Sequence, residues 1–183
     1  MKLIRIPIFP FDKWIGRWVA RTSPAWARRG SRVLSWLADE RFTIGLSASF
    51  WLVTRLVSRH RHLATHTLRV AAVTAVVPHL LKWITVQERP DRAEPAARQR
   101  RVAHSGRAFD AFPSGHAVHL GGLAAVASRA MPRHASVVWF TAGMLGITRI
   151  LVLAHWSSDV AAGLALGAEL ERLMFAVEHG DGA

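Results

Sequence analysis

The sequence predicts an all-α protein: a multi-pass membrane helical bundle of about five to six helices, preceded by an amphipathic N-terminal arm. Apolar residues make up 51% of the 183 residues, and five segments along the chain are predominantly apolar. No run of alternating apolar and polar residues is long enough to indicate a sheet. We therefore divide the chain into an arm, a bundle and a tail, at residues 1–41, 42–177 and 178–183.

Composition and charge exclude several classes of protein. The absence of cysteine excludes disulfides, thiolate metal sites and a cysteine nucleophile, and the apolar content is too high for a disordered basic tail. The net charge of +12 is typical of two classes, a nucleic-acid binder and a membrane protein with basic flanks. Half of this charge lies in residues 1–41, which carry nine basic and three acidic side chains.

The N-terminal arm has the pattern of two amphipathic helices. The first has apolar residues on one helical face, at Phe11, Trp14, Ile15, Trp18 and Val19. Ser23 and Pro24 have the residue types of an N-cap and a first helical position. The apolar face of the second helix consists of Trp26, Val33, Leu34 and Leu37. Trp and Arg on opposite faces are typical of helices on an anionic membrane surface, and two helices packed on a soluble core are the alternative.

The bundle is predicted from five apolar segments. They cover residues 42–57, 63–87, 114–131, 135–154 and 159–177. Their hydropathy is marginal, because the longest run without a charged residue has 18 residues, whereas a spanning helix needs about 20 mostly apolar ones. Hydropathy alone therefore leaves a soluble helical bundle open. Lys82 and Arg149 lie deep within segments, where charged residues usually serve a function.

The first chemical motif begins at the end of the second segment. Lys82 and Arg89 are seven residues apart, which predicts one helical face, with Pro90 ending the helix. The connection 88–112 is polar and long, as functional loops often are. The sequence Pro-Ser-Gly-His at 113–116 then begins an apolar segment, and the amide groups of such a helix N-terminus form an anion site.

The second chemical motif lies between the last two segments. Thr148 and Arg149 are followed by His155 and Asp159, whose spacing of four residues predicts a shared helical face. A carboxylate beside an imidazole would hold one tautomer and raise its basicity. With the cations and amides of the other motif, this set suits a phosphate, a histidine nucleophile and a second histidine as general acid. A single carboxylate makes a poor hard-metal site, so we expect no metal and no cofactor.

Together these motifs resemble the three-part signature of the type-2 phosphatidic acid phosphatase superfamily. This superfamily includes lipid phosphate phosphatases, bacterial non-specific acid phosphatases and vanadium haloperoxidases. The matching blocks are Lys82 with Arg89-Pro90, then residues 113–116, then Thr148-Arg149 with His155 and Asp159. The departures are Thr148 in place of serine, Ser157 in place of proline, and five apolar segments where membrane members have six spans.

The resemblance implies a role for each matched residue. His155 would attack phosphorus to form a phosphohistidine, Asp159 would orient His155, and His116 would protonate the leaving oxygen and then help to activate water. Five further residues would bind the phosphoryl oxygens: Lys82, Arg89, Ser114, Gly115 and Arg149. The bundle 42–177 would then be a metal-independent catalytic unit.

The resulting prediction is a membrane-bound lipid phosphate phosphatase. It would hydrolyse a phosphomonoester or diphosphate of a lipid, such as isoprenyl diphosphate, phosphatidate, phosphatidylglycerophosphate or a lipid A phosphate. A phosphotransferase that uses a lipid hydroxyl in place of water is the first alternative. A basic module that binds anionic lipid or nucleic acid is the second, although it leaves the two histidine motifs without a purpose. We expect a bacterial inner-membrane protein with its site on the outer face and no nucleic-acid partner, and leave its oligomeric state open.

Overall fold

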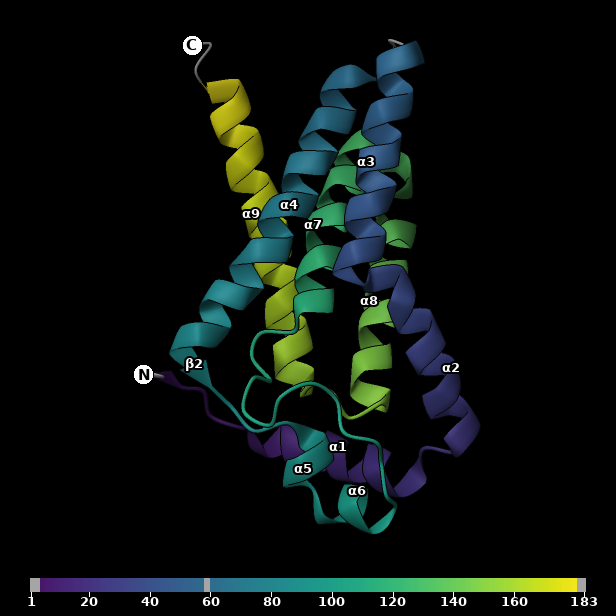
Figure 1. The fold of residues 1–183 in the computed structure, drawn as a ribbon, viewed down its shortest axis with the longest axis vertical. Helices are drawn as coiled ribbons and strands as arrows, with labels where there is room; N and C mark the ends of the chain where they lie inside the picture. Colours follow the sequence, from purple (N-terminus) through teal and green to yellow (C-terminus); the bar gives the residue numbers. More distant parts are fainter. Residues whose placement is uncertain (1–3, 58–59, 181–183) are drawn as a thin grey trace.

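The computed structural model describes residues 4–57 and 60–180 as an elongated helical bundle (Figure 1). At one end of the bundle lies a cap, formed by the helices 10–22, 90–93 and 95–99 and the loop that follows them. The described residues form nine α-helices and one parallel pair of two-residue strands, β1 (Ile4–Arg5) and β2 (Thr85–Val86). The prediction of a predominantly helical protein is confirmed. The number of helices exceeds five to six because the arm and the connection 88–112 form helices of their own.

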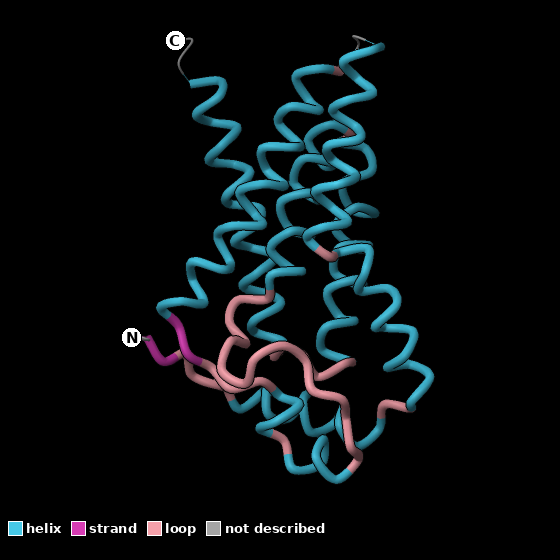
Figure 2. The backbone as a smooth tube through the Cα atoms, viewed as in Figure 1, coloured by secondary structure: helices cyan, strands magenta, loops and turns pink. Residues whose placement is uncertain are grey.

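The bundle contains five long helices that run along the long axis of the molecule (Figures 1 and 2). They are α3 (Glu40–Val57), α4 (Arg61–Ile84), α7 (Gly115–Ala130), α8 (Ala135–Leu151) and α9 (Ser157–Gly180). α7 lies at the centre, packed against α4, α8 and α9. α9 continues into residues predicted as tail, and residues 181–183 of that tail lie outside the described residues.

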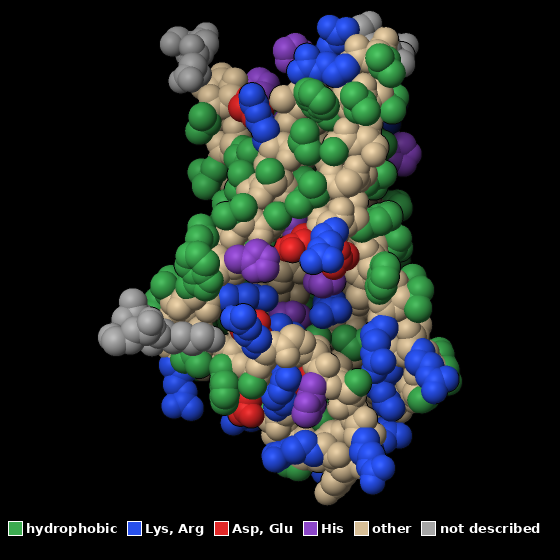
Figure 3. Space-filling model, in the orientation of Figure 1, with side chains coloured by type: hydrophobic (Ala, Val, Ile, Leu, Met, Phe, Trp, Pro, Cys, Tyr) green, Lys and Arg blue, Asp and Glu red, His purple; other side chains and the backbone are tan. Residues whose placement is uncertain are grey.

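The outer surface of the bundle is apolar. Large side chains that are more than half exposed there include Leu46, Leu52, Leu56, Val76, Phe140 and Leu173. Figure 3 shows hydrophobic side chains over the upper part of this surface and Lys and Arg side chains around the lower end. In the described residues, Arg61–Ile84 and Pro132–Leu151 are long and apolar enough to cross a membrane. An extended apolar surface of this kind suits lipid better than water.

Glycines allow α7 and α9 to pack in backbone contact. A Cβ atom on Gly121 would overlap the carbonyl oxygen of Leu164, and one on Gly167 would overlap that of Val118. Gly163 and Gly167 form the small-xxx-small pattern that lets membrane helices approach closely. The spacing of these two glycines is readable from the sequence.

Replacing Gly167 with alanine should therefore destabilise the fold by about 2 kcal/mol or more, because the overlap is with backbone that cannot rotate away. Gly143→Ala on α8 is the matched control, since nothing lies within 4 Å of its added Cβ, and it should be neutral or stabilising. Thermal unfolding of detergent-solubilised protein measures both. Equal midpoints for the two variants would contradict this account of the packing.

A polar cluster, whose members His66 and Glu171 are buried, joins α4, α7 and α9 at the end of the bundle away from the cap. Glu171, only 1% exposed, accepts hydrogen bonds from Nε and Nη2 of Arg129 over 2.9 and 3.0 Å. His66 lies between two carboxylates, 3.3 Å from Glu171 and 2.8 Å from Glu178. Burial of the Glu171 carboxylate is tolerated because the Arg129 guanidinium pairs with it.

The arm forms two helices, but their apolar faces point away from the bundle. α1 (Pro10–Thr22) buries Asp12, Gly16, Val19 and Ala20, whereas its large aromatic residues are exposed, at Phe11, Trp14 and Trp18. Of the predicted apolar face of α1, only Val19 is fully buried and Ile15 is half-buried. α1 thus packs through small and polar residues, which permit close approach to the bundle.

The second helix of the arm packs in the same way. α2 (Ala25–Ser35) buries Ser31 and Ser35 and lies against α8. It exposes its predicted apolar face, at Trp26, Val33, Leu34 and Leu37. Pro24 is the N-cap and Ala25 the first helical residue, so the predicted helix start was one residue too early.

The predicted helical face shared by Lys82 and Arg89 is wrong. α4 ends at Ile84, and the backbone then becomes extended because Thr85 and Val86 pair with Ile4 and Arg5. Arg89 lies in extended backbone at the N-cap of α5 (Pro90–Ala93), which is followed by α6 (Pro95–Gln99).

Candidate active site

A cavity of about 270 Å³ lies where α4, α7 and the turn between α8 and α9 meet the cap. Six of the eight predicted site residues line it: Lys82, Arg89, Gly115, His116, Arg149 and His155. Asp39, Glu40 and His79 lie among the other lining residues. Figure 3 shows Lys, Arg and His side chains around a hollow in this face of the molecule. Motifs far apart in the sequence therefore meet in one cavity.

The N-terminus of α7 forms one wall of the cavity. Gly115 is the first residue of the helix and Ser114 is its N-cap, so the helix N-terminus lies within residues 113–116, as predicted. The Ser114 amide donates to the backbone oxygen of Asp159 over 3.3 Å, which ties α7 to the start of α9. Ser114 is fully buried and its hydroxyl has no hydrogen-bond partner among the described residues. A buried polar group without a partner costs free energy of folding, and each such group calls for an explanation, often a functional one.

Arg149 carries a second buried atom of this kind. It lies in the last turn of α8, and its Nε is buried without a partner in the described part of the chain. Thr148, beside it, bonds to Ser35 of α2 over 3.1 Å and does not line the cavity. The hydroxyl at position 148 therefore serves packing between helices in this structure.

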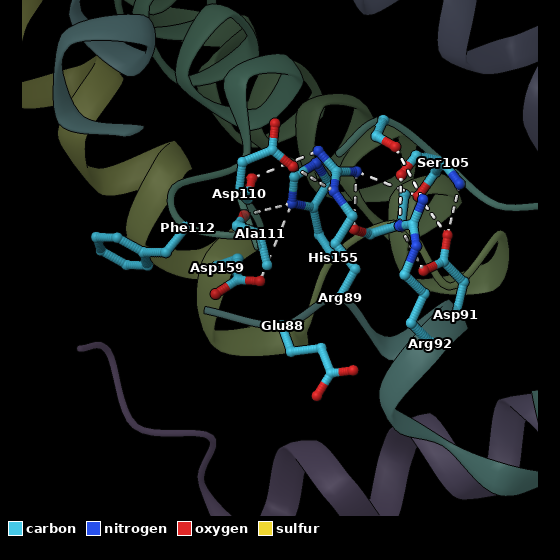
Figure 4. Close-up of polar contacts among 12 residues, drawn as sticks. Glu88, Arg89, Asp91, Arg92, Ser105, Asp110, Ala111, Phe112, His155 and Asp159 are labelled. Atoms are coloured by element: carbon cyan, nitrogen blue, oxygen red, sulfur yellow. Dashed lines mark hydrogen bonds and ion pairs between the residues drawn. The ribbon is translucent and has the colours of Figure 1, made fainter. Parts of the chain in front are cut away.

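Arg89 is held rigidly by the connection between α6 and α7 (Figure 4). Its Nε donates to Asp110 over 2.8 Å, and its Nη1 donates to the Ser105 hydroxyl and to the Ala154 carbonyl oxygen. Gly106 has φ +49°, and a Cβ there would lie 2.8 Å from Nη2 of Arg89. A glycine is therefore required for the connection to approach the guanidinium.

The predicted shared helical face of His155 and Asp159 is wrong. α9 begins at Ser157, so His155 lies in the turn that joins α8 to α9. Leu153 in this turn has φ +56°, a strained conformation for leucine, and its carbonyl oxygen accepts the Asp91 amide over 3.0 Å. The turn therefore depends on α5, which lies sixty residues earlier in the chain.

His155 is oriented by a backbone carbonyl rather than directly by Asp159. Its Nδ1 lies 2.6 Å from the Ala111 oxygen and 4.0 Å from Oδ2 of Asp159 (Figure 4). A carbonyl oxygen can only accept, so Nδ1 carries the proton and Nε2 keeps its lone pair. Burial lowers the pKa of His155 well below its ordinary value, and the nearby cations lower it further. The imidazole is therefore neutral, which is the nucleophilic form.

Asp159 is fully buried and stabilises the turn through hydrogen bonds. Its Oδ2 accepts the Trp156 amide over 2.8 Å, and the Trp156 indole donates to the Glu88 oxygen. With its amide nitrogen turned toward the carboxylate, Gln87 donates to Oδ1 over 2.7 Å. Gln87 was not among the predicted site residues, and the one sign of it in the sequence is its position two residues before Arg89. Gln87 also pairs with Asp110 through its backbone, which places Ala111 beside His155.

Comparison with known proteins agrees with this geometry. Residues 63–181 match the model of the PAP2 superfamily. The chain belongs to the PAP2 superfamily. This family of phosphatidic acid phosphatase type 2 proteins is the one that the three motifs resemble, so that prediction is confirmed.

Two relatives from bacteria share the name lipid A 1-phosphatase. One, from Rhizobium johnstonii, is 38% identical over 96 residues, which cover 52% of this chain and 39% of the relative. The other, from Rhizobium etli, is 29% identical over 178 residues, covering 90% of this chain and 75% of the relative. The match thus spans well under half the length of the first relative and three quarters of the second.

Two crystal structures share the fold. A transmembrane PAP2-type phosphatidylglycerolphosphate phosphatase from Bacillus subtilis has a TM-score of 0.71 at 22% identity, covering 93% of this chain and 85% of its own. Aquifex aeolicus LpxE has a TM-score of 0.77 at 17% identity, covering 94% and 99%. The chain is an integral membrane protein, as its apolar outer surface and its membrane relatives indicate.

Proposed function

We propose that this PAP2 protein is a membrane-bound lipid phosphate phosphatase that works through a phosphohistidine at His155. The observation that carries the proposal is the cavity itself, where three cations surround a neutral imidazole with a free Nε2. Lys82, Arg89 and Arg149 can neutralise a phosphoryl group, and the buried Nε of Arg149 gains a partner when a phosphate oxygen binds. The same cations repel metal ions, so the proposed reaction uses none.

The proposed reaction has two steps. Nε2 of His155 attacks phosphorus, the bond from phosphorus to the leaving oxygen breaks, and His116 donates a proton to that oxygen. His116 then accepts a proton from water, whose oxygen attacks the phosphohistidine and releases inorganic phosphate and neutral His155. Ser114 and Gly115 supply further donors at the N-terminus of α7. Asp159 acts on His155 through the Trp156 turn.

Among the candidate substrates, we propose a lipid A 1-phosphate. The support is the name shared by the two bacterial relatives. Phosphate release from lipid A, phosphatidylglycerophosphate, phosphatidate and an isoprenyl diphosphate, each presented in mixed micelles, tests this choice. We expect the highest kcat/KM with lipid A, and a higher value with any other member would replace the substrate.

The same assay separates hydrolysis from phosphotransfer. In the proposed hydrolase, free phosphate accounts for all dephosphorylated lipid, with or without an added lipid alcohol. Dephosphorylated lipid in excess of free phosphate, matched by a phosphorylated alcohol, would establish the phosphotransferase instead. Nucleic acid is not a proposed partner, because Arg89 is buried inside the cavity.

The arm is proposed to lie in the membrane interface, with its exposed tryptophans, Trp14, Trp18, Trp26 and Trp36, in the headgroup region. The proposed location is the bacterial inner membrane with the site on its outer face, as in the family arrangement. The nine basic residues of the arm would favour the opposite orientation under the positive-inside rule, so orientation needs a direct measurement.

A cysteine at Arg101, in the cap, should react with an impermeant thiol reagent added to whole cells, whereas one at Arg133, before α8, should not. Both side chains are exposed, at opposite ends of the bundle, and the chain has no cysteine of its own. Labelling of Arg133→Cys alone would place the site in the cytoplasm and overturn the proposed orientation.

A further inference from the structure

One fully buried carboxylate of the arm is not explained by the proposed chemistry. Asp12 lies in the first turn of α1 and has no solvent exposure. It forms no ion pair with a basic side chain of the described residues, although burial of an unpaired carboxylate is costly. It also lies outside residues 63–181, which match the family model. Its burial therefore calls for a specific set of partners.

Those partners are the first two residues of α9, together with the Phe9 amide at the start of α1, which donates to Oδ2 over 3.4 Å. Oδ1 of Asp12 accepts the Ser157 hydroxyl over 2.6 Å and the Ser158 amide over 2.9 Å. Oδ2 accepts the Ser158 hydroxyl over 2.6 Å. A carboxylate that receives amide and hydroxyl donors at a helix N-terminus acts as an N-cap, and it is further stabilised by the helix dipole. Asp12 thus caps α9 from a different helix.

The capped turn is the one that carries the proposed catalytic pair. Ser157 and Ser158 lie between His155 and Asp159 in the sequence, so the first turn of α9 sets the separation of those two side chains. Oδ2 of Asp159 bonds the Trp156 amide within the same turn. A displacement of Ser157 and Ser158 would therefore move both members of the pair.

α1 holds the turn at a second point. Gly16, one helical turn after Asp12, faces the ring of Trp156, and a Cβ on Gly16 would lie 2.8 Å from that ring. The Trp156 indole donates to Glu88 on its other edge, so the ring is fixed between α1 and the segment that leads to Arg89. The arm therefore contacts Trp156 as well as Ser157 and Ser158.

We propose that Asp12 is a positioning residue of the active site: by capping α9 from the arm, it holds the turn that places His155 and Asp159. The inference rests on the proposed phosphatase function. Asp12 does not line the cavity and does not touch the phosphate. Its removal should therefore lower kcat and leave substrate binding unchanged.

Two substitutions separate hydrogen bonding from charge. Asp12→Ala removes every acceptor, whereas Asp12→Asn keeps one oxygen that can accept the Ser157 hydroxyl and the Ser158 amide. For Asp12→Ala we expect a fall in kcat of about 10- to 100-fold, because a displacement on the order of 1 Å at a reacting group has an effect of this size. KM should stay within about twofold of its original value, and Asp12→Asn should recover most of kcat. The control is Arg21→Ala, which removes an exposed charge from the same helix.

Rates are to be expressed per folded protein, as measured by monodisperse recovery in detergent. Where Asp12→Ala does not fold, the double variant Ser157→Ala/Ser158→Ala removes the two hydroxyl donors while Asp12 stays in place, and it should show the same loss of kcat. When Asp12→Ala or the double serine variant is combined with Asp159→Asn, the losses of kcat, expressed as free energies, should be less than additive, because both changes act on one turn.

Two results would overturn the inference: a folded Asp12→Ala or double serine variant with the kcat of the unaltered protein, or a loss confined to KM. Failure of the proposed function is distinct, since the unaltered protein would then release no phosphate from any of the four lipids.

Discussion

Replacing His155 with asparagine is expected to lower kcat for phosphate release by about 10⁴-fold or more, as loss of a nucleophile does in other enzymes. Asparagine can still donate its side-chain amide to the Ala111 oxygen that now accepts Nδ1–H, so the turn is expected to stay intact. The variant loses the nucleophilic Nε2 together with part of the imidazole ring. The protein is to be denatured rapidly, without acid, during turnover of ³²P-labelled lipid. The unaltered protein should then carry the label, whereas the His155→Asn variant should carry none.

His134→Asn is the matched control, because His134 is exposed at the other end of α8 and should retain full activity. A His155→Asn protein that hydrolyses lipid phosphate at the rate of this control would exclude a phosphohistidine at position 155. Label that persists in the variant would place the nucleophile on another residue.

Replacing Arg149 with glutamine is expected to lower kcat/KM by about 10²- to 10³-fold, the usual effect of removing one donor to a developing oxyanion. The fold should not lose stability. Nε of Arg149 is buried without a partner, and relief of an unsatisfied donor is worth on the order of 1 kcal/mol, so the unfolding midpoint should stay equal or rise. Activity and stability should therefore move independently at this position.

Arg89→Gln is the informative comparison. It should lose activity to a similar degree but also lower the unfolding midpoint, because Arg89 bonds to Asp110, Ser105 and Ala154. Inorganic phosphate should raise the midpoint of the unaltered protein and raise it less in Arg149→Gln. Strong destabilisation by Arg149→Gln, with phosphate binding unchanged, would show that Arg149 serves packing instead.

Much of the bundle was predictable because it depends on local pattern. Apolar segments of suitable length formed α3, α4, α7, α8 and α9 within a few residues of their predicted bounds. α7 begins at Gly115, next to its predicted start at residue 114, since an apolar helical run is a property of neighbouring residues. The order and spacing of the histidine and cation motifs also identified the family before any contact was known.

The errors arose where distant segments decide the backbone. Helical spacing suggested that Lys82 and Arg89 share a face, but pairing of β2 with the N-terminal strand ends α4 at Ile84. His155 and Asp159 are four residues apart, yet the Asp91 amide holds a turn at Leu153 and α9 starts only at Ser157. Spacing alone could not anticipate either outcome, because the competing hydrogen bonds come from residues far away in the chain.

The helical segments, the family and the choice of side chains proposed to bind phosphate were all predictable from local patterns in the sequence. Only the tertiary structure decided how the site is held: Ala111 accepts Nδ1 of His155, and Asp12 of the arm caps α9. The physical reason is the range of the forces involved. Helix propensity and apolar periodicity act over a few residues and can be read directly from the sequence. A buried hydrogen bond, in contrast, joins whichever donor and acceptor the packed helices bring within about 3 Å.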